Sequence, residues 1–406
     1  MVNSKLTSGT LNAIGSFSYS CLSLFFMLVI TRINGLEQAG VFSLLYALVN
    51  LIYNIGVYSG RTYQVSDHSR GVTDKDYLAQ RVITTAIMAI TGVVICFTST
   101  KYRVDMVLAV LLIIMRCLDS ISEVFYGMMQ KHNHLDHVGL SMIIKSAGVV
   151  FIFTLADMIT KNVVASFAGT LAIITSEMVI YEYPDIRRYL KASVKKESVI
   201  KIFRKGIYAC LVAVFANYLT SAPKYALAEY VTAEEQAIFN IISMPATAVV
   251  LCAIFIIQPF TVDLSKHYRE KNMESFSACL NLCLFAILGV GGLFMLGGYF
   301  CGIPLLNAVY GTEISSYKVD LMIVLFGALF SGIFNILIAA FTVMEKTKGL
   351  MGITGLTTVF TYFTAKAMVS EFGFRGGSFT FAFSMFMVAL ICMTVYYGIQ
   401  IKFGEI

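Results

Sequence analysis

Long apolar runs alternate with short polar segments along the whole chain. The runs have about 18 to 25 residues, which is the length that a helix needs to cross roughly 30 Å of hydrocarbon. Twelve runs can be placed, at 11–30, 41–58, 82–97, 106–129, 138–158, 163–181, 206–228, 237–260, 276–300, 321–344, 350–369 and 377–399. Because they are long and continuously apolar, unlike the alternating strands of a barrel, they predict an all-α integral membrane protein with about twelve transmembrane helices.

The composition agrees with this pattern and excludes a water-soluble protein. Of 406 residues, 58% are hydrophobic and 13% are charged, and the mean hydropathy is +0.77. A soluble domain carries roughly 25% charged residues. The nine cysteines have no metal-ligand spacing, so we predict no metal site. We also predict no cofactor and no nucleic-acid partner. No cleavage site follows the first run, so we expect it to be retained.

Basic residues are distributed unequally between the two sides of the predicted membrane. With the N-terminus inside, the cytoplasmic segments hold 20 of the 30 Lys and Arg residues, the outer segments hold six, and four fall within spans. Cytoplasmic loops carry the excess of basic residues in membrane proteins. Both termini are therefore predicted to be cytoplasmic.

One polar connection stands out at the middle of the chain. The segment 184–205 carries eight basic and two acidic residues. We interpret it as a cytoplasmic linker held against anionic lipid headgroups. It divides the sequence into an N-terminal six-helix lobe, 1–183, and a C-terminal six-helix lobe, 206–406.

The two halves carry matching polar residues at a nearly fixed offset. The tripeptide Glu-Gln-Ala precedes the second span at 37–39 and the eighth span at 235–237, an offset of 198. Ser, His and Arg follow at 66, 68 and 70 and again at 265, 267 and 269, an offset of 199. This register predicts a duplication into two pseudo-symmetric lobes around a central cavity. Six spans per half give both lobes the same orientation, as in transporters that work by alternating access.

Polar side chains form helical stripes on spans 1, 2, 7 and 8. A polar stripe in lipid faces either protein or water. The stripes consist of Asn12, Ser16, Ser20 and Ser23; Ser43, Tyr46, Asn50, Asn54 and Arg61; Asn217, Ser221 and Lys224; and Asn240, Ser243 and Thr247. Hydrogen bonding between helices explains any single stripe. Four stripes on equivalent helices favour one shared wet cavity.

Four basic residues lie within the predicted spans: Arg116, Lys145, Lys224 and Lys366. Together they predict a cationic cavity, which attracts an anionic substrate, and phosphate is the anion that such a cavity suits best. Pro223 precedes Lys224 and frees backbone groups beside that charge. For Lys224 and Lys366 the alternative is snorkelling to the outer headgroups.

Acidic residues lie on the fourth and sixth spans. Arg116, Asp119 and Glu123 form an i, i+3, i+7 row, so Arg116 has the alternative of belonging to a paired structural cluster. The same row, together with Glu177 on the sixth span, is our candidate for coupling to a proton or sodium gradient.

The stretch 31–44, TRINGLEQAGVFSL, resembles the R-x-x-G-x-x-x-x-G-x-[FY]-S pattern that follows the first span of Wzx-type polysaccharide repeat-unit flippases. These belong to the multidrug/oligosaccharidyl-lipid/polysaccharide (MOP) superfamily. The stretch 204–271 looks like the start of the second lobe in the same family. The resemblance covers essentially the whole chain in span count and lobe division.

The resemblance implies a carrier in the bacterial cytoplasmic membrane. Its cargo would be a polyprenyl-diphosphate-linked oligosaccharide, moved to the outer leaflet for surface polysaccharides such as O-antigen and lipopolysaccharide. Its partners would be membrane lipids and other membrane proteins of polysaccharide assembly. On this basis Arg61 and Lys224 would contact diphosphate, with Arg116, Lys145 and Lys366 as further cationic contacts. The sugar hydroxyls would meet Asn12, Asn50, Asn54, Asn217 and Asn240.

Two other functions are compatible with a polytopic membrane protein. A cation-coupled multidrug exporter of the same superfamily would hold cationic drugs with carboxylates, whereas spans 1, 2, 7 and 8 carry Arg61 and Lys224 and no acidic residue in their polar stripes. A membrane glycosyltransferase or polymerase would need an acidic pair in a large extramembrane region, and the outer loops are short. The sequence therefore predicts a transporter and not an enzyme.

Overall fold

The computed structural model describes residues 2–58, 60–66 and 71–404. Every regular element in these ranges is helical. Eight helical stretches within them are long and apolar enough to cross a membrane. Three further long helices carry charged residues along their length, namely α5 (Met106–Lys131), α9 (Lys196–Tyr230) and α15 (Thr347–Phe372). The predicted all-α, multi-pass membrane protein is confirmed.

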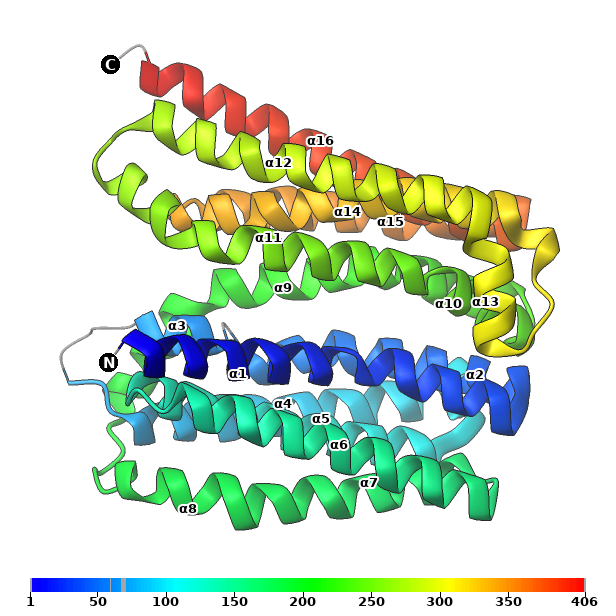
Figure 1. The fold of residues 1–406 in the computed structure, drawn as a ribbon, viewed down its shortest axis with the longest axis horizontal. Coiled ribbons are helices and arrows are strands. Elements are labelled where there is room, and N and C mark those ends of the chain that lie inside the picture. Colours follow the sequence, from blue (N-terminus) through cyan, green and yellow to red (C-terminus); the bar gives the residue numbers. More distant parts are fainter. Residues whose placement is uncertain (1, 59, 67–70, 405–406) are drawn as a thin grey trace. The chain divides into compact units, whose positions relative to one another are not determined.

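The chain forms two compact units, Met1–Val214 and Phe215–Ile406. Within each unit the helices run side by side (Figure 1). The first unit contains α1 (Val2–Ser20), α2 (Leu22–Val57), α3 (Gly60–Ser66), α4 (Asp74–Thr98), a 3₁₀ turn at Thr100–Asp105, α5, α6 (Leu135–Thr160), α7 (Val163–Glu177), a π-helical turn at Met178–Glu182, α8 (Tyr183–Ile186), a 3₁₀ turn at Arg187–Tyr189 and the start of α9.

The second unit contains the rest of α9, α10 (Ala233–Ile242), α11 (Met244–Arg269), α12 (Met273–Gly297), a π-helical turn at Gly298–Gly302, α13 (Ile303–Tyr310), a 3₁₀ turn at Ser315–Tyr317, α14 (Lys318–Val343), α15 and α16 (Phe374–Gly404). The twelve predicted spans lie within these helical segments, apart from the end residues Tyr58 and Met344, but several helices extend well beyond the predicted ends. The first predicted span is divided at Cys21, between α1 and α2, and the eighth at Ser243, between α10 and α11. The predicted lobe boundaries at 183 and 206 stay a prediction.

Particular residues start, bend and join the helices. Thr73 and Asp76 form a capping box that begins α4, and Thr232 and Glu235 form the corresponding box at α10. Gly35 has φ 89° and ψ 176°, so it breaks α2 between the first two predicted spans. The two caps begin their helices at Asp74 and Ala233, before the predicted span starts at 82 and 237.

The two units repeat one packing scheme. In the first, α2 packs on α4 and α5, α4 on α5, and α7 on α5 and α6. In the second, α11 packs on α12 and α14, α12 on α14, and α16 on α14 and α15. The first and fifth spans also pair in both units, through α1 with α6 and through Phe215 of α9 with Gly355 and Thr358 of α15. The same pairing of equivalent helices is what a duplicated sequence predicts.

Candidate functional site

A fully buried lysine lies near the middle of α6 in the first unit. Lys145 has an exposed fraction of 0%, and its Nζ lies 2.7 Å from Glu182 Oε1 and 3.4 Å from Glu177 Oε2. It also donates to Ser122 Oγ at 2.8 Å and to the Tyr126 hydroxyl at 3.1 Å. Four helical segments thus converge on one ammonium group, because α5, α6, α7 and the following π-helical turn each supply a side chain.

The charges of this cluster do not balance. One ammonium faces two carboxylates, which gives a net charge of −1 when both are ionised. Ser141 Oγ lies 2.7 Å from Glu177 and 2.9 Å from Glu182, and a hydroxyl has one proton to donate. Glu177 Oε2 is buried without a hydrogen-bond donor among the described residues, and it contacts Lys145 through the ion pair at 3.4 Å. This oxygen is a place where a proton or small cation would neutralise the cluster.

A second charged cluster surrounds Arg116 on α5. Its guanidinium donates to Asp119 at 2.8 Å, to the Tyr46 hydroxyl at 2.6 Å and to Asn50 Oδ1. The rings of Tyr46 and Tyr53 lie 4.9 and 5.1 Å from the guanidinium carbon, within the range of cation–π attraction. Arg116 therefore forms an ion pair with Asp119, as the alternative of a paired structural cluster predicts from their i, i+3 spacing.

The Arg116 cluster borders a small cavity inside the first unit. Tyr19 of α1 donates to Asp119, and Tyr19, Tyr46, Arg116 and Asp119 line a space of about 20 Å³ together with apolar side chains. That is room for one water molecule. Glu123, one helical turn further along α5, makes neither a hydrogen bond nor an ion pair with the part of the chain that the structure describes.

The structure separates the three predicted coupling residues. Asp119 lies in the Arg116 cluster, Glu177 lies in the Lys145 cluster, and Glu123 joins neither. Glu182 is the partner that sequence reasoning missed. It follows the predicted sixth span, and the π-helical turn at Met178–Glu182 places it inward, fully buried.

Predicted substrate contacts in the first unit have varied surroundings. Arg61 of α3 has Nη1 buried without a hydrogen-bond partner among the described residues. Asn12 Oδ1 of α1 is likewise buried and unbonded within the described residues. Asn54 donates to the Asn50 carbonyl of its own helix at 2.8 Å. Asn50 itself is engaged by Arg116. Arg61 and Asn12 are therefore the members of this set with unused buried hydrogen-bonding groups.

In the second unit, Lys224 is a cation that has no counter-ion in the described part of the chain. Its Nζ donates to Asn240 Oδ1 at 2.6 Å, and it forms no ion pair with the described residues. Gln236 donates to the Lys224 carbonyl at 3.2 Å, which tightens the connection between α9 and α10. Asn217, two helical turns earlier on α9, has Oδ1 buried and unbonded within the described structure.

Lys366 contrasts with Lys224. Its Nζ lies 3.1 Å from Glu229 Oε2, and its side chain is 60% exposed. It therefore pairs with an acidic residue near a helix end, whereas Lys224 is held by neutral amide groups.

No family model matches the sequence. The chain is 24% identical over 386 residues to the capsular polysaccharide biosynthesis protein CapF of Staphylococcus aureus, covering 91% of this chain and 93% of CapF.

Solved structures share the fold at low sequence identity. An inward-facing multidrug resistance MATE family transporter of the MOP superfamily has a TM-score of 0.72 at 12% identity, covering 97% of this chain and 96% of the other. A MOP superfamily transporter from Pyrococcus furiosus, described as having a binding pocket of reverse polarity, has a TM-score of 0.64 at 14% identity, covering 98% and 96%. The chain thus has the fold of MOP superfamily transporters, which confirms the resemblance seen in the sequence.

Proposed function

We propose that this chain is a flippase that moves a polyprenyl-diphosphate-linked oligosaccharide from the cytoplasmic to the outer leaflet by alternating access. The observation that carries the proposal is Lys224, a cation held by Asn240 with no carboxylate partner. The similarity to a polysaccharide biosynthesis protein supports this class of cargo, and the transporter fold supports alternating access.

The neutral partner of Lys224 matters because a charge within a membrane is costly unless it is paired or used. A Lys–Asp pair would have no net charge to offer a ligand. A Lys–Asn pair keeps its positive charge and positions it, so that an incoming phosphate supplies the missing counter-ion. Arg61, with an unbonded Nη1, is a second donor of the same sign.

The unbonded amide oxygens suit the carbohydrate part of the substrate. Asn12 Oδ1 and Asn217 Oδ1 are buried acceptors without donors among the described residues. A buried polar atom left unpaired costs about 1–3 kcal/mol, and a sugar hydroxyl is a donor that removes this cost. The two asparagines are therefore the proposed hydroxyl contacts best supported by the structure.

Coupling to a proton or sodium gradient belongs to the same proposal, and the Lys145 cluster is its location. Glu177 and Glu182 share one lysine, so the cluster gains a neutral state when it takes up one cation. Such a change in charge gives the two conformations of an alternating-access carrier different affinities for the ion.

The test is transport of a lipid-linked oligosaccharide by the purified protein in proteoliposomes, with outer-leaflet substrate detected by a glycan-specific lectin. We expect Lys224→Glu to abolish transport and Lys224→Arg to keep part of it. Lys348→Glu is the matched control and should transport normally, because that lysine is exposed in the first turn of α15, outside the predicted spans. Normal transport by Lys224→Glu at equal reconstitution would refute the proposal.

A multidrug exporter is the competing function, favoured by the MATE family structures with the same fold. The same vesicles distinguish the two functions. A cationic dye should not be exported by the wild type, whereas an exporter would move the dye and leave the lipid-linked oligosaccharide in place.

A further inference from the structure

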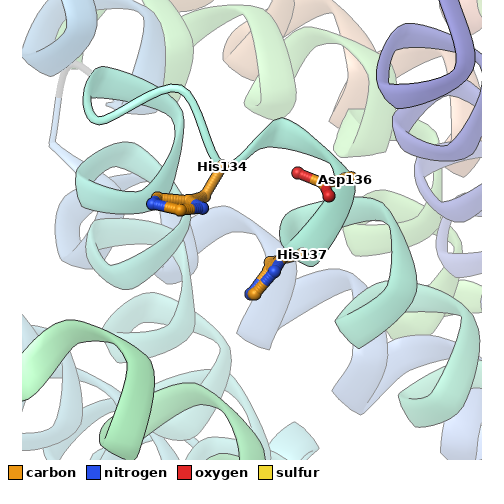
Figure 2. Close-up of side chains that lie close together, drawn as sticks. All are labelled: His134, Asp136 and His137. Carbon is orange, nitrogen blue, oxygen red and sulfur yellow. The ribbon is translucent and has the colours of Figure 1, made fainter. Parts of the chain in front are cut away.

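Two histidines and an aspartate gather where the loop after α5 enters α6. His134 precedes the helix, and Asp136 and His137 lie in its first turn. One possible ligand atom from each side chain lies within 4.8 Å of the other two, and all three residues are partly exposed. Figure 2 shows the three side chains together at this turn. His134 makes no capping hydrogen bond, so helix capping does not explain its placement.

A carboxylate orients the imidazole of His137. His137 Nδ1 lies 2.8 Å from Asp185 Oδ2 of α8. With Nδ1–H donating to this carboxylate, the lone pair of the neutral ring is on Nε2. Metal-binding histidines almost always have this arrangement, in which the second ring nitrogen donates to a carboxylate or carbonyl. The residue that fixes the ring comes from a segment 48 positions away in the sequence.

The ring of His134 also presents a lone pair. Arg188 Nη2 lies 3.2 Å from His134 Nε2, and a guanidinium only donates hydrogen bonds, so Nε2 is the acceptor. The same Arg188 nitrogen lies 3.0 Å from Asp185 Oδ1. Arg188 thus occupies the position that a cation would take at His134, while it retains a second partner in Asp185.

We propose that His134, Asp136 and His137 bind a divalent transition metal ion of the zinc class. The two imidazoles and the carboxylate supply three ligands, and water completes the site. Asp185 orients His137 without binding the metal. Nitrogen and oxygen ligands at about 2.0–2.2 Å from a tetrahedral ion lie roughly 3.4 Å apart, so ligand atoms that now lie within 4.8 Å of one another must close by up to about 1.4 Å. Partly exposed side chains on a loop and a first helical turn can make this adjustment.

Metal binding competes with Arg188 in this arrangement. The ion takes the lone pair of His134 and displaces the guanidinium, which keeps its ion pair with Asp185. Arg188 lies in the basic segment 184–205, and its neighbour Tyr189 stacks on His132 with ring centroids 3.8 Å apart. Metal binding therefore changes the contacts that hold Arg188 and Tyr189 against the loop after α5. The inference does not depend on the proposed transport function.

The test uses the full chain in detergent with its affinity tag removed and chelator dialysed away. Titration with Co²⁺ should give the intense visible absorption of a tetrahedral complex at one equivalent, and Zn²⁺ should displace it. His134→Ala and His137→Ala should each weaken Co²⁺ binding at least tenfold. Asp185→Asn should weaken it about 10- to 100-fold, as other orienting carboxylates do. Arg188→Ala should strengthen it, because a competing cation is removed.

His267→Ala is the control and should bind Co²⁺ like the wild type, because His267 lies in the second unit on α11. A single symmetric gel-filtration peak and an unchanged far-UV circular dichroism spectrum establish that each variant is folded. Absence of stoichiometric Co²⁺ binding by the wild type would overturn the proposal. So would binding that survives both His134→Ala and His137→Ala.

Discussion

Replacement of Lys145 by methionine tests the charge balance of the buried cluster. The substitution removes the ammonium from Glu177 and Glu182 and keeps a side chain of similar length, so little cavity is created. Breaking a buried ion pair by removing one partner costs about 3–5 kcal/mol, because the remaining charge is left uncompensated. We expect a loss of this size at pH 7 in the free energy of unfolding.

The same loss can be derived from proton binding. Without Lys145, the two carboxylates of the folded protein must hold one more proton than they do in the wild type if the charge of the cluster is to stay the same. A glutamate in the unfolded chain has an ordinary pKa of about 4.3 and releases that proton at higher pH. The folded state then binds more protons than the unfolded state, so stability falls by about 1.4 kcal/mol for each pH unit above that value. Between pH 5 and pH 7 the variant should lose about 2.7 kcal/mol relative to the wild type.

The assay is the free energy of unfolding in bicelles, measured by steric trapping at pH 5 and pH 7. Lys366→Met is the matched control, because its ion pair with Glu229 is exposed, and it should show little change at either pH. The double variant Lys145→Met/Glu182→Gln should recover much of the loss at pH 7, since it removes one of the uncompensated carboxylates. If Lys145→Met has the same pH dependence as the wild type, the assigned charge balance is wrong.

Three further predictions concern transport and packing. Asn240→Asp would give Lys224 an internal counter-ion, so transport of the diphosphate-linked substrate should fall at least tenfold with expression unchanged; unaltered transport would contradict the role of Lys224. Glu177→Gln should remove the stimulation of transport by an imposed proton or sodium gradient while basal exchange remains, and persistent stimulation would place coupling elsewhere. Gly139→Val should lower the melting temperature markedly, because a Cβ at Gly139 would lie 2.4 Å from the Leu11 backbone; Gly349→Val is the control with open space, and equal melting temperatures would argue against the close packing of α1 on α6.

The helices were predictable because each span is encoded locally. Length, hydropathy and the Glu-Gln-Ala repeat are visible in single stretches of sequence, and the packing scheme repeats as the duplication predicts. The pairing of Arg116 with Asp119 was also predictable as one alternative, because residues three apart on a helix are neighbours.

The buried partners were not predictable, because they are distant in sequence. Glu182 lies 37 positions from Lys145, and an irregular π-helical turn places it inward. Tyr46 and Tyr19 reach the Arg116 cluster from other helices, and no periodicity links them to it. The i, i+3 spacing of His134 and His137 is visible in the sequence, but two histidines alone do not make a metal site. Asp185, which orients His137, became evident only in the folded chain.

The duplication indicates which charges serve the fold and which do not. Helices α5 and α14 hold the same place in the packing schemes of their units. The residues at equal distances from their first residues are Arg116, Asp119 and Glu123 in α5, and Ala328, Ser331 and Asn335 in α14. Both helices have 26 residues and make the same pairings, so the charges are not needed to build this bundle.

A charged side chain at the centre of a membrane helix costs about 2.5–3.5 kcal/mol on insertion scales. Charges present in one copy of a duplicated helix and absent from the other therefore need a reason beyond packing. Within the proposed function, that reason is a division of labour. In the first unit, buried carboxylates pair with Lys145 and Arg116. This arrangement suits binding and release of a small cation. The second unit leaves Lys224 without a carboxylate, which suits an anionic headgroup. A carrier that couples the two needs two sites of opposite charge, because one ligand is a cation and the other an anion, and Glu177 and Lys224 supply them here.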